Sequence, residues 1–373
     1  MELQPSHAPG VVEDAVAWAR TELVRLIEIP STSGDETEII AYLERRAREL
    51  GLPVRRHPVA ADRDNLVIGC QRAPEIAVIA HVDTVDPTGR RPLRARVRGN
   101  QVWGIGASDD KGAVVAALLA MVLAKQAGAR PAELPVAVGL TVDEEQDGSG
   151  SAALADSLHP RRVVVLEATG MDVAIAAAGS VEASVRVRGR SAHGSLPETG
   201  DNAVVKAARL VVALEGLLPA AADPLADALL VQQFHGGSEL HVVPDVAEIQ
   251  LDARVGPGGD PQAVLSSLRA LVAGYDGELE VIEIVTPWSM PADSPFVAAV
   301  AKAVADETGR QPQLIAFPAW TDAHNMVEIC AAEAVVLGPG PLLRHAHRPD
   351  DRIDVREVVA CAGVLRRLIV AAG

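Results

Sequence analysis

Histidines and carboxylates recur at strand ends and glycine loops in this 373-residue sequence. His81 and Asp83 directly follow an apolar, β-rich run at residues 76–80. In an open α/β sheet, ligands bind just beyond the carboxyl ends of the strands, so this pair stands where such a sheet places its chemistry. Asp83 could hydrogen-bond the His81 imidazole and fix its tautomer for metal binding. A single histidine after a strand is more often structural, so this pair alone is a weak signal.

Two adjacent aspartates, Asp109 and Asp110, lie in a glycine-rich segment that runs from Gly104 to Gly112. The segment lacks the Gly-x-x-x-x-Gly-Lys-Ser/Thr spacing of a phosphate-binding loop. An acidic helix cap would explain Asp110, because carboxylates favour helix N-termini, but it leaves Asp109 and the glycines without a reason. A carboxylate that bridges metal ions at a loop–helix junction accounts for more of the segment.

Three consecutive carboxylates, Asp143, Glu144 and Glu145, end a β-rich run at residues 135–142. Adjacent carboxylates repel one another unless something cationic lies among them. A solvated acidic turn is an equally good interpretation of this segment taken alone. The segment therefore supports a metal site only together with the others.

Two further ligand candidates come later in the chain. Glu167 directly follows the apolar residues 163–166, where a charge is costly without a partner. His345 and His347 follow a flexible Gly-Pro-Gly loop at residues 338–340. All these segments offer His, Asp and Glu but no Cys. Such mixed nitrogen and oxygen ligands, with carboxylates to spare, suit a pair of zinc ions with an open position for water.

The elements that would carry these residues alternate between strand and helix, which predicts an α/β layer with a largely parallel sheet. The pattern changes near residue 179, where polar and apolar residues alternate as in half-exposed antiparallel strands. The strand-like runs of this part lie at residues 181–188, 229–234, 240–243, 247–255 and 279–285. The α/β pattern resumes after Pro287. We therefore expect a catalytic domain at residues 1–178 and 289–373, interrupted by a smaller α+β domain at residues 179–288.

The net charge, the cysteines and the apolar runs of the chain limit its possible partners and its cellular compartment. The formal net charge of -16 argues against nucleic acid or an anionic membrane surface as a partner. The 3 cysteines are odd in number and far apart, which favours reduced thiols in a cytoplasmic protein over a disulfide framework. The longest apolar run, residues 113–124, is too short to span a bilayer, and the N-terminus has no signal-peptide pattern. We expect a cytoplasmic protein.

Taken together and in order, the motifs resemble those of the zinc-dependent family of acetylornithine deacetylase, succinyl-diaminopimelate desuccinylase, glutamate carboxypeptidase and aminoacylase. The resemblance covers nearly the whole chain. It implies a zinc-exopeptidase-like catalytic domain, a dimerisation or lid domain as the insert, and two Zn²⁺ per chain, for which Co²⁺ or Mn²⁺ can substitute. The metal ligands that it implies are His81, Asp109, Glu145, Glu167 and His347.

The resemblance also implies individual roles. Asp109 would bridge both ions and join Asp110 through a cis peptide bond, while Glu144 would be the general base and Asp83 a catalytic partner of the ligand histidine. In the insert, His193 would reach the site of a partner subunit and polarise the scissile carbonyl, so we expect a homodimer. Arg254 and Asn202 would bind substrate, Arg254 through a carboxylate. Without the resemblance, His193 is a surface-loop histidine and Arg254 one half of a salt bridge.

The implied reaction is cleavage of the amide bond in a small N-acyl amino acid or a short peptide that has a free carboxylate. Whether the enzyme is a deacetylase or desuccinylase, or a carboxypeptidase, stays open. Arg344, His345 and Arg348 make the loop around His347 unusually basic, with Trp320 as an aromatic nearby, and this combination matches no single substrate. A catalytically inactive relative that serves as a binding or scaffold protein would lack a ligand or the base, and none is missing. A nucleotide-binding α/β protein is disfavoured by the absent phosphate loop.

Overall fold

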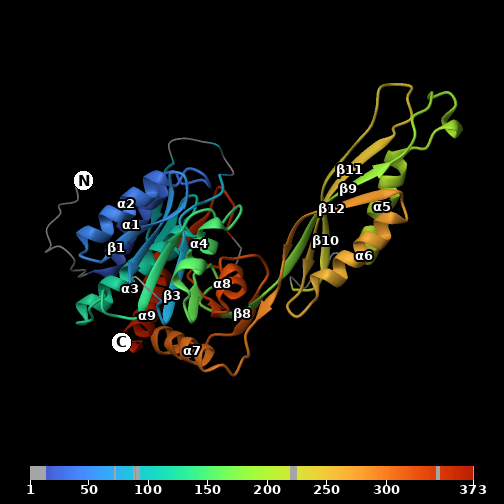
Figure 1. Cartoon of the computed structure of the whole chain (residues 1–373). Coiled ribbons are helices and arrows are strands. Elements are labelled where there is room, and N and C mark those ends of the chain that lie inside the picture. The colour runs from blue at the N-terminus through green and yellow to red at the C-terminus, as the bar shows by residue number, and fades with distance from the viewer. Residues whose placement is uncertain are drawn as a thin grey trace. The chain divides into compact units, whose positions relative to one another are not determined.

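The computed structural model describes residues 14–70, 73–86, 89, 93–218, 225–341 and 345–372 (Figure 1). The chain divides into two compact units. The first unit comprises Met1–Ile175, Met290–Ile315 and Thr321–Gly373, and the second comprises Ala176–Ser289 and Ala316–Trp320. The short stretch Ala316–Trp320 was not part of the insert that we expected at residues 179–288. Arg344 lies outside the described residues.

A nine-stranded mixed sheet has the strand order β1-β2-β6-β3-β7-β15-β8-β13, with β14 paired to β8. In that order the strands are Val54–Ala60, Arg63–Gly69, Val136–Thr141, Ile76–His81, Arg162–Val165, Glu333–Val336, Val173–Ala177 and Trp288–Ser289, and β14 is Leu314–Phe317. The central strands β6, β3, β7 and β15 run parallel, and antiparallel strands extend the sheet on both sides. The α/β class with a largely parallel central sheet is confirmed.

Helices cover this sheet, and their apolar residues form its core (Figure 1). They are α1 (Ala15–Glu28), α2 (Thr37–Glu49), α3 (Lys111–Gln126), α4 (Ser149–Leu158), α7 (Pro295–Thr308), α8 (Ala323–Cys330) and α9 (Val355–Ala371). Helices α1, α3, α7 and α9 pack against one another, and α4 packs against α8. Nearly all of α3 is buried, because its sequence is apolar on every face.

A small three-stranded sheet lies beside the ligand loops. Its order is β16-β5-β4, with β4 at Arg96–Arg98, β5 at Gln101–Trp103 and β16 at Arg352–Asp354. Strands β4 and β5 form a hairpin around Gly99, whose φ of 59° suits a tight turn. The backbone N–H of Gly104, just after β5, donates to the carbonyl of Asp351, so the hairpin ties the aspartate loop to the C-terminal part of the chain.

The second unit is an antiparallel sheet with helices on one face. Its strand order is β10-β11-β9-β12. The elements are β9 (Gly179–Arg188), the 3-10 turn η1 (Pro197–Thr199), α5 (Ala203–Leu217), β10 (Ala228–Gly236), β11 (Val246–Val255), α6 (Pro261–Ala273) and β12 (Gly277–Val285). Alternate side chains of β9 and β11 are buried in the core that includes residues of α5 and α6, as their polar–apolar alternation predicted.

One predicted strand, residues 240–243, is wrong. The segment is a turn in which only Val242 makes an isolated bridge, to His193. Its apolar pattern imitates a strand, but the side chain of Leu240 is 86% exposed and buries nothing. His241 has a φ of 67°, outside the extended region, and Pro244 has no N–H to give to a ladder.

Two further findings concern membrane-spanning helices and the cysteines. Within the described part of the chain, no helix has both the length and the apolar character to cross a membrane. Cys361 is a buried free thiol in α9, and Cys330 is a partly buried free thiol whose Sγ donates to the carbonyl of Met326.

Candidate metal centre

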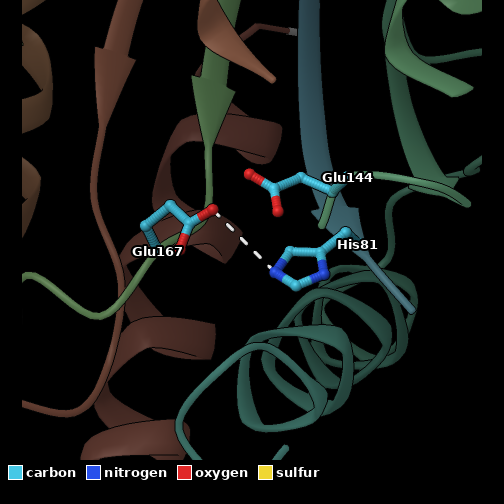
Figure 2. A group of neighbouring side chains, drawn as sticks. All are labelled: His81, Glu144 and Glu167. Atoms are coloured by element: carbon cyan, nitrogen blue, oxygen red, sulfur yellow. Dashed lines mark ion pairs between the residues drawn. The ribbon is translucent and has the colours of Figure 1, made fainter. Parts of the chain in front are cut away.

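Three parallel strands deliver the first group of ligand candidates to one edge of the sheet. His81 is the last residue of β3 and pairs with Thr141, the last residue of β6. Glu144 follows β6 and Glu167 follows β7, the strand on the other side of β3. Figure 2 shows the three side chains converging, and their ligand atoms all lie within 4.8 Å of one another. The Nε2 of His81 is 3.9 Å from Oε1 of Glu167.

Asp109 connects this group to a second one. Its Oδ1 lies 3.1 Å from Nε2 of His81, and its Oδ2 lies 3.5 Å from Nε2 of His347. The same His347 nitrogen is 2.8 Å from Oε2 of Glu145. The two oxygens of one carboxylate therefore face two histidines, each with a glutamate beside it. The structure brings together all the side chains that the sequence proposed as metal ligands.

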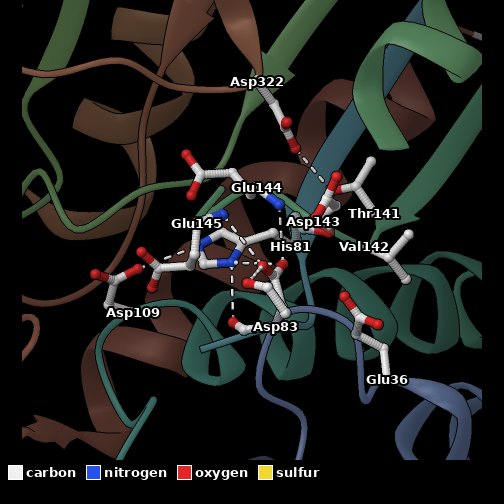
Figure 3. A network of polar contacts seen from close by, with 12 residues as sticks. Glu36, His81, Asp83, Asp109, Thr141, Val142, Asp143, Glu144, Glu145 and Asp322 are labelled. Carbon is white, nitrogen blue, oxygen red and sulfur yellow. Dashed lines mark hydrogen bonds and ion pairs between the residues drawn. The ribbon is translucent and has the colours of Figure 1, made fainter. Parts of the chain in front are cut away.

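Asp83 supports the centre from below (Figure 3). The Nδ1 of His81 lies 3.1 Å from the main-chain carbonyl oxygen of Asp83 and 3.5 Å from its Oδ1. Because a carbonyl oxygen only accepts, Nδ1 carries a proton in this contact, which leaves Nε2 as the ring nitrogen that can bind a metal ion. The carboxylate of Asp83 also accepts from the backbone N–H groups of Glu144 and Glu145, both at 3.1 Å. One residue thus orients the histidine and the acidic turn together.

Asp143 differs from the two glutamates that follow it. Its carboxylate accepts from Arg63 at 3.0 Å and from Ser149 Oγ at 2.5 Å, and Arg63 also pairs with Glu36. Its φ of 68° turns the backbone at the end of β6. The salt bridge fixes the turn from which Glu144 and Glu145 reach the centre (Figure 3).

The aspartate loop is anchored by its neighbour Lys111. This side chain is fully buried, and its ammonium donates to the carbonyl oxygens of Leu26 and Ile29, each at 2.9 Å. The N-terminal end of α3 is thereby tied to the end of α1. The peptide bond between Asp109 and Asp110 is cis, as the resemblance implied.

The buried carboxylates of the centre need positive charge to neutralise them. Burial, and then the neighbouring carboxylates, raise the pKa values of Glu144, Glu167 and Asp110 well above their usual range. Burial lowers the pKa of His81, but the surrounding carboxylates more than offset it and raise that pKa well above its ordinary value. Both carboxylate oxygens of Asp110 and Oε1 of Glu145 are buried without a hydrogen-bond donor among the described residues. Crowded anionic oxygens without donors fit divalent cations bound by nitrogen and oxygen ligands.

Two buried acids beside the centre escaped the sequence analysis. Asp322 is 1% exposed, accepts from Thr141 Oγ1 at 2.7 Å, and has a pKa raised by burial to about 6. Asp351 accepts from the backbone and hydroxyl of Ser108, and burial raises its pKa to about 7. Both were visible as aspartates near predicted motifs, but nothing in their spacing separates a buried acid from a helix cap or a solvated turn.

The predicted substrate and catalytic residues of the insert all belong to the second unit. His193 is exposed in a loop, and its Nδ1 accepts from the backbone N–H of Ser195 at 3.2 Å. Asn202 caps α5, because its Oδ1 accepts from two backbone N–H groups of the first turn. Arg254 is partly buried and donates from Nε to the carbonyl of Ala226 at 3.0 Å. Their roles in binding and catalysis remain predictions.

The loop with unusual basic residues is only partly described. Arg348 is exposed, and its Nε lies 3.2 Å from the carboxylate of Asp350. His345 lines a cavity of about 900 Å³ in the first unit together with Trp103, Arg310 and Arg352. The arginines there already face acids: Arg310 contacts Asp172 at 2.6 Å, and Arg352 lies 3.7 Å from Asp350.

Comparison with known proteins gives the family. Residues 77–371 match peptidase family M20/M25/M40. Acetylornithine deacetylase of Myxococcus xanthus is 28% identical, over 96% of this chain and 98% of that protein. A tripeptidase from Staphylococcus aureus has the same fold, with a TM-score of 0.81 and 20% identity over 96% of this chain and 98% of that one. The YXEP protein of Bacillus subtilis is described as a dinuclear metal binding peptidase from the M20 family. Its structure matches with a TM-score of 0.71 and 17% sequence identity, over 96% of this chain and 98% of that one. The chain therefore belongs to peptidase family M20/M25/M40, as its motifs indicated, and is a hydrolase of amide or peptide bonds.

Proposed function

We propose that this chain is a dinuclear zinc amidohydrolase that cleaves the amide bond of an N-acyl amino acid or short peptide with a free carboxylate. The observation that carries the proposal is the position of Asp109, whose two oxygens face His81 and His347. Asp109 would be shared by two Zn²⁺, one also held by His81 and Glu167, the other by Glu145 and His347. Co²⁺ or Mn²⁺ would suit the same oxygen and nitrogen ligands. The dinuclear centre named for the Bacillus subtilis protein supports the stoichiometry.

The mechanism follows from the side chains around that centre. Bound divalent cations would act as Lewis acids on the scissile carbonyl and make a water molecule more acidic. Glu144 takes the proton of the attacking water and passes it to the leaving nitrogen, which is the work of a general base that then becomes a general acid. Asp83 keeps His81 in the tautomer that leaves Nε2 unprotonated, and holds the backbone of Glu144 in place.

A hydrolysis screen tests the function. The purified protein, loaded with zinc, cobalt or manganese, is offered N-acyl amino acids and dipeptides, and we expect turnover that chelation abolishes. Glu144→Ala should keep about two metals per chain and lose at least about a hundredfold in kcat, because it removes the proton carrier rather than a ligand. Gln146→Ala, at an exposed position of the same turn, is the matched control. Near-normal rates in Glu144→Ala would remove this residue as the base.

The alternative to an enzyme is a catalytically inactive relative that acts as a binding or scaffold protein. That alternative predicts metal binding without turnover of any acyl amino acid or peptide in the same screen. The presence of every proposed ligand and of Glu144 favours the enzyme. The named relatives include both a deacetylase and a tripeptidase, so the screen must contain both substrate types.

The second unit would complete the site in a homodimer. His193 would donate to the oxyanion that forms in the partner's site, and a symmetric pair of chains would exchange two such residues. Mixing two inactive variants tests this arrangement. Co-refolded Glu144→Ala and His193→Ala chains should recover up to about half of the wild-type activity per mixed dimer, because each mixed dimer contains one site with both residues intact. Mixed dimers that stay inactive would contradict a shared site. A cytoplasmic location belongs to the same proposal.

A further inference from the structure

A cavity of about 490 Å³ lies entirely within the second unit, on the sheet face opposite the core of that unit. Strands β9, β10 and β11 form its floor, and the segment with Trp320 contributes to its wall. Three charged side chains line it: Glu182 on β9, and Asp252 and Arg254 on β11. It is therefore a partly apolar hollow in which both signs of charge lie close together.

The strand register places the acid Glu182 directly between two other acids, Asp252 of β11 and Glu283 of β12, which differs from the pairing further along the same face. Elsewhere, opposite charges meet across the strands: Arg186 lies directly opposite Glu248, and their side chains approach to 2.5 Å. Arg188 contacts Glu278 of β12 at 3.0 Å, diagonally across the strands. Inside the cavity, Asp252 lies directly opposite Glu182. Like charges at directly opposed positions destabilise a sheet. Stability therefore does not explain this pair, and a functional role is the expected reason for it.

Asp252 also has unused capacity for a donor. Its Oδ1 is buried and accepts no hydrogen bond from any residue that the structure describes. Burial, and then the charge of Glu182, raise the pKa of Asp252, while the guanidinium of Arg254 lowers it. A buried carboxylate oxygen without a donor costs free energy that a ligand with N–H groups would recover.

We propose that this cavity, which we call the acid–arginine pocket, binds a substrate that carries both charges: an ammonium group against Asp252 and Glu182, and a carboxylate against Arg254. An ammonium group supplies the missing donors, and Trp320 in the wall offers an aromatic surface of the kind that attracts cations. A bare metal ion fits less well, because Arg254 would repel it. A molecule that brings its own carboxylate adds a further acceptor for the guanidinium, which already donates to the carbonyl oxygen of Ala226.

This inference rests on the proposed function and narrows its substrate class. Arg254 and Asp252 are two residues apart on one face of β11, about 7 Å at the backbone, so the two charges of the ligand are recognised separately. The preferred substrate would then be cationic as well as carboxylate-bearing. The positive charge comes either from a basic side chain, as in an N-acyl diamino acid, or from the free α-amino group of a peptide.

Matched substrates separate these two sources. N-acetylornithine and N-acetylnorleucine have side chains of the same length and shape, charged in the first and neutral in the second. A dipeptide and its N-acetylated form differ in the α-amino charge. We expect kcat/KM to favour the charged member of at least one pair by about tenfold or more, the value of one charged hydrogen bond. The pair that shows the preference identifies the source of the charge.

Neutral, isosteric variants tie the preference to the pocket. Asp252→Asn and Glu182→Gln should each bring the ratio of kcat/KM values toward one. Glu248→Gln removes a carboxylate from the same face of the same strand, outside the pocket, and should leave the ratio unchanged. A wild-type enzyme without preference in either pair, or a preference that survives both pocket variants, would overturn the inference.

Direct binding keeps the inference testable if the proposed function itself fails. Should no acyl amino acid or peptide be hydrolysed, calorimetric titration of ornithine, norleucine and N-acetylnorleucine still probes the pocket in the same proteins. Tighter binding of ornithine than of norleucine, or of norleucine than of its N-acetyl form, that is lost in Asp252→Asn and kept in Glu248→Gln would support the pocket. Equal affinity within both pairs would refute it.

Discussion

Carboxylates crowd together in both units of this molecule, but under different conditions. Around His81 they are buried, their pKa values are raised, and most of the neighbouring charges are also acidic. In the second unit, Asp252 and Glu182 are only partly buried and have Arg254 beside them. Burial and the number of carboxylates decide which cation can neutralise such a group. The first arrangement requires concentrated positive charge, as divalent ions supply, whereas the second requires one organic cation.

The two groups also differ in how they are held. The ligands of the first unit follow strand ends and are fixed by contacts between distant segments, such as Arg63 with Asp143 and Lys111 with the end of α1. Asp252 and Glu182 stand within strands, where pairing alone sets their separation. A metal centre built by converging segments should therefore fail as a unit when one shared ligand is removed, while a strand-borne pair should respond gradually.

Removing the shared carboxylate is the largest expected effect. Asp109→Ala should reduce bound metal from about two ions per chain to less than one and lower kcat/KM by at least about a thousandfold, because both ions lose a ligand. Metal analysis after dialysis measures the first quantity. Asp156→Ala, at an exposed position of α4, is the control and should keep its metal. If Asp109→Ala kept nearly two metal ions per chain, Asp109 would not be the bridging ligand. The contrast between the metal centre and the carboxylates of the second unit would then also fail.

The stability of the metal-free protein should depend on pH because buried carboxylates are crowded together in the first unit. Asp322 and Asp351, with pKa values raised to about 6 and about 7, hold their protons more tightly when folded than when unfolded. The free energy of unfolding should therefore be highest below the unfolded-state pKa of about 4, fall as the pH rises from there to about 7, and level off above it, with a loss on the order of 3 kcal/mol for a pKa shift of two units. Thermal unfolding between pH 5 and 8 measures this.

Metal binding and one substitution serve as controls for that measurement. Divalent ions replace protons among the carboxylates, so the metal-loaded protein should show a flatter pH dependence. Asp351→Asn removes one of the two titrating groups and should reduce the slope of the metal-free protein, while Asp156→Asn should not. A metal-free melting temperature that is constant or rises from pH 5 to 8 would contradict the crowding.

The sequence predicted the metal centre better than its surroundings, for a physical reason. Apolar runs that end in His81 or Glu167 mark buried parallel strands, and the carboxyl ends of such strands meet at one edge. What each carboxylate does there depends on partners from distant segments. Asp143 and Glu144 are adjacent and chemically alike, yet Arg63 draws only the first away from the centre. Asp322 joins the group through Thr141, a contact that no spacing reveals.

The fold shows the same limit. Strand β1 was not predicted, because Val54–Ala60 includes arginines, a histidine and a proline and forms a strand only by pairing with β2. Residues 240–243 were predicted as a strand from their apolar pattern alone, although no neighbouring strand accepts them. Helices α6 and α9 are defined by local signals, because the side chains of Asp260 and Asp354 cap their first turns. Local signals were sufficient where the element is defined by its own residues.

The smallest expected effect is on stability. It distinguishes the repulsive pair Asp252 and Glu182 from the attractive pair Glu248 and Arg186 on the same face of the second unit's sheet. Asp252→Asn relieves repulsion from Glu182 and should raise the free energy of unfolding at pH 8 by about 0.5 kcal/mol, whereas Glu248→Gln breaks an attractive pair and should lower it by a similar or smaller amount. The gain should shrink as the pH is lowered toward the pKa of Asp252, which burial and the charge of Glu182 raise above its usual value, because protonation removes the repulsion. Urea unfolding of the metal-loaded protein, with the second unit followed by amide exchange on β11, resolves changes of this size. Equal destabilisation by both substitutions would show that Asp252 already has a favourable partner, and the pocket would lose the argument from strain.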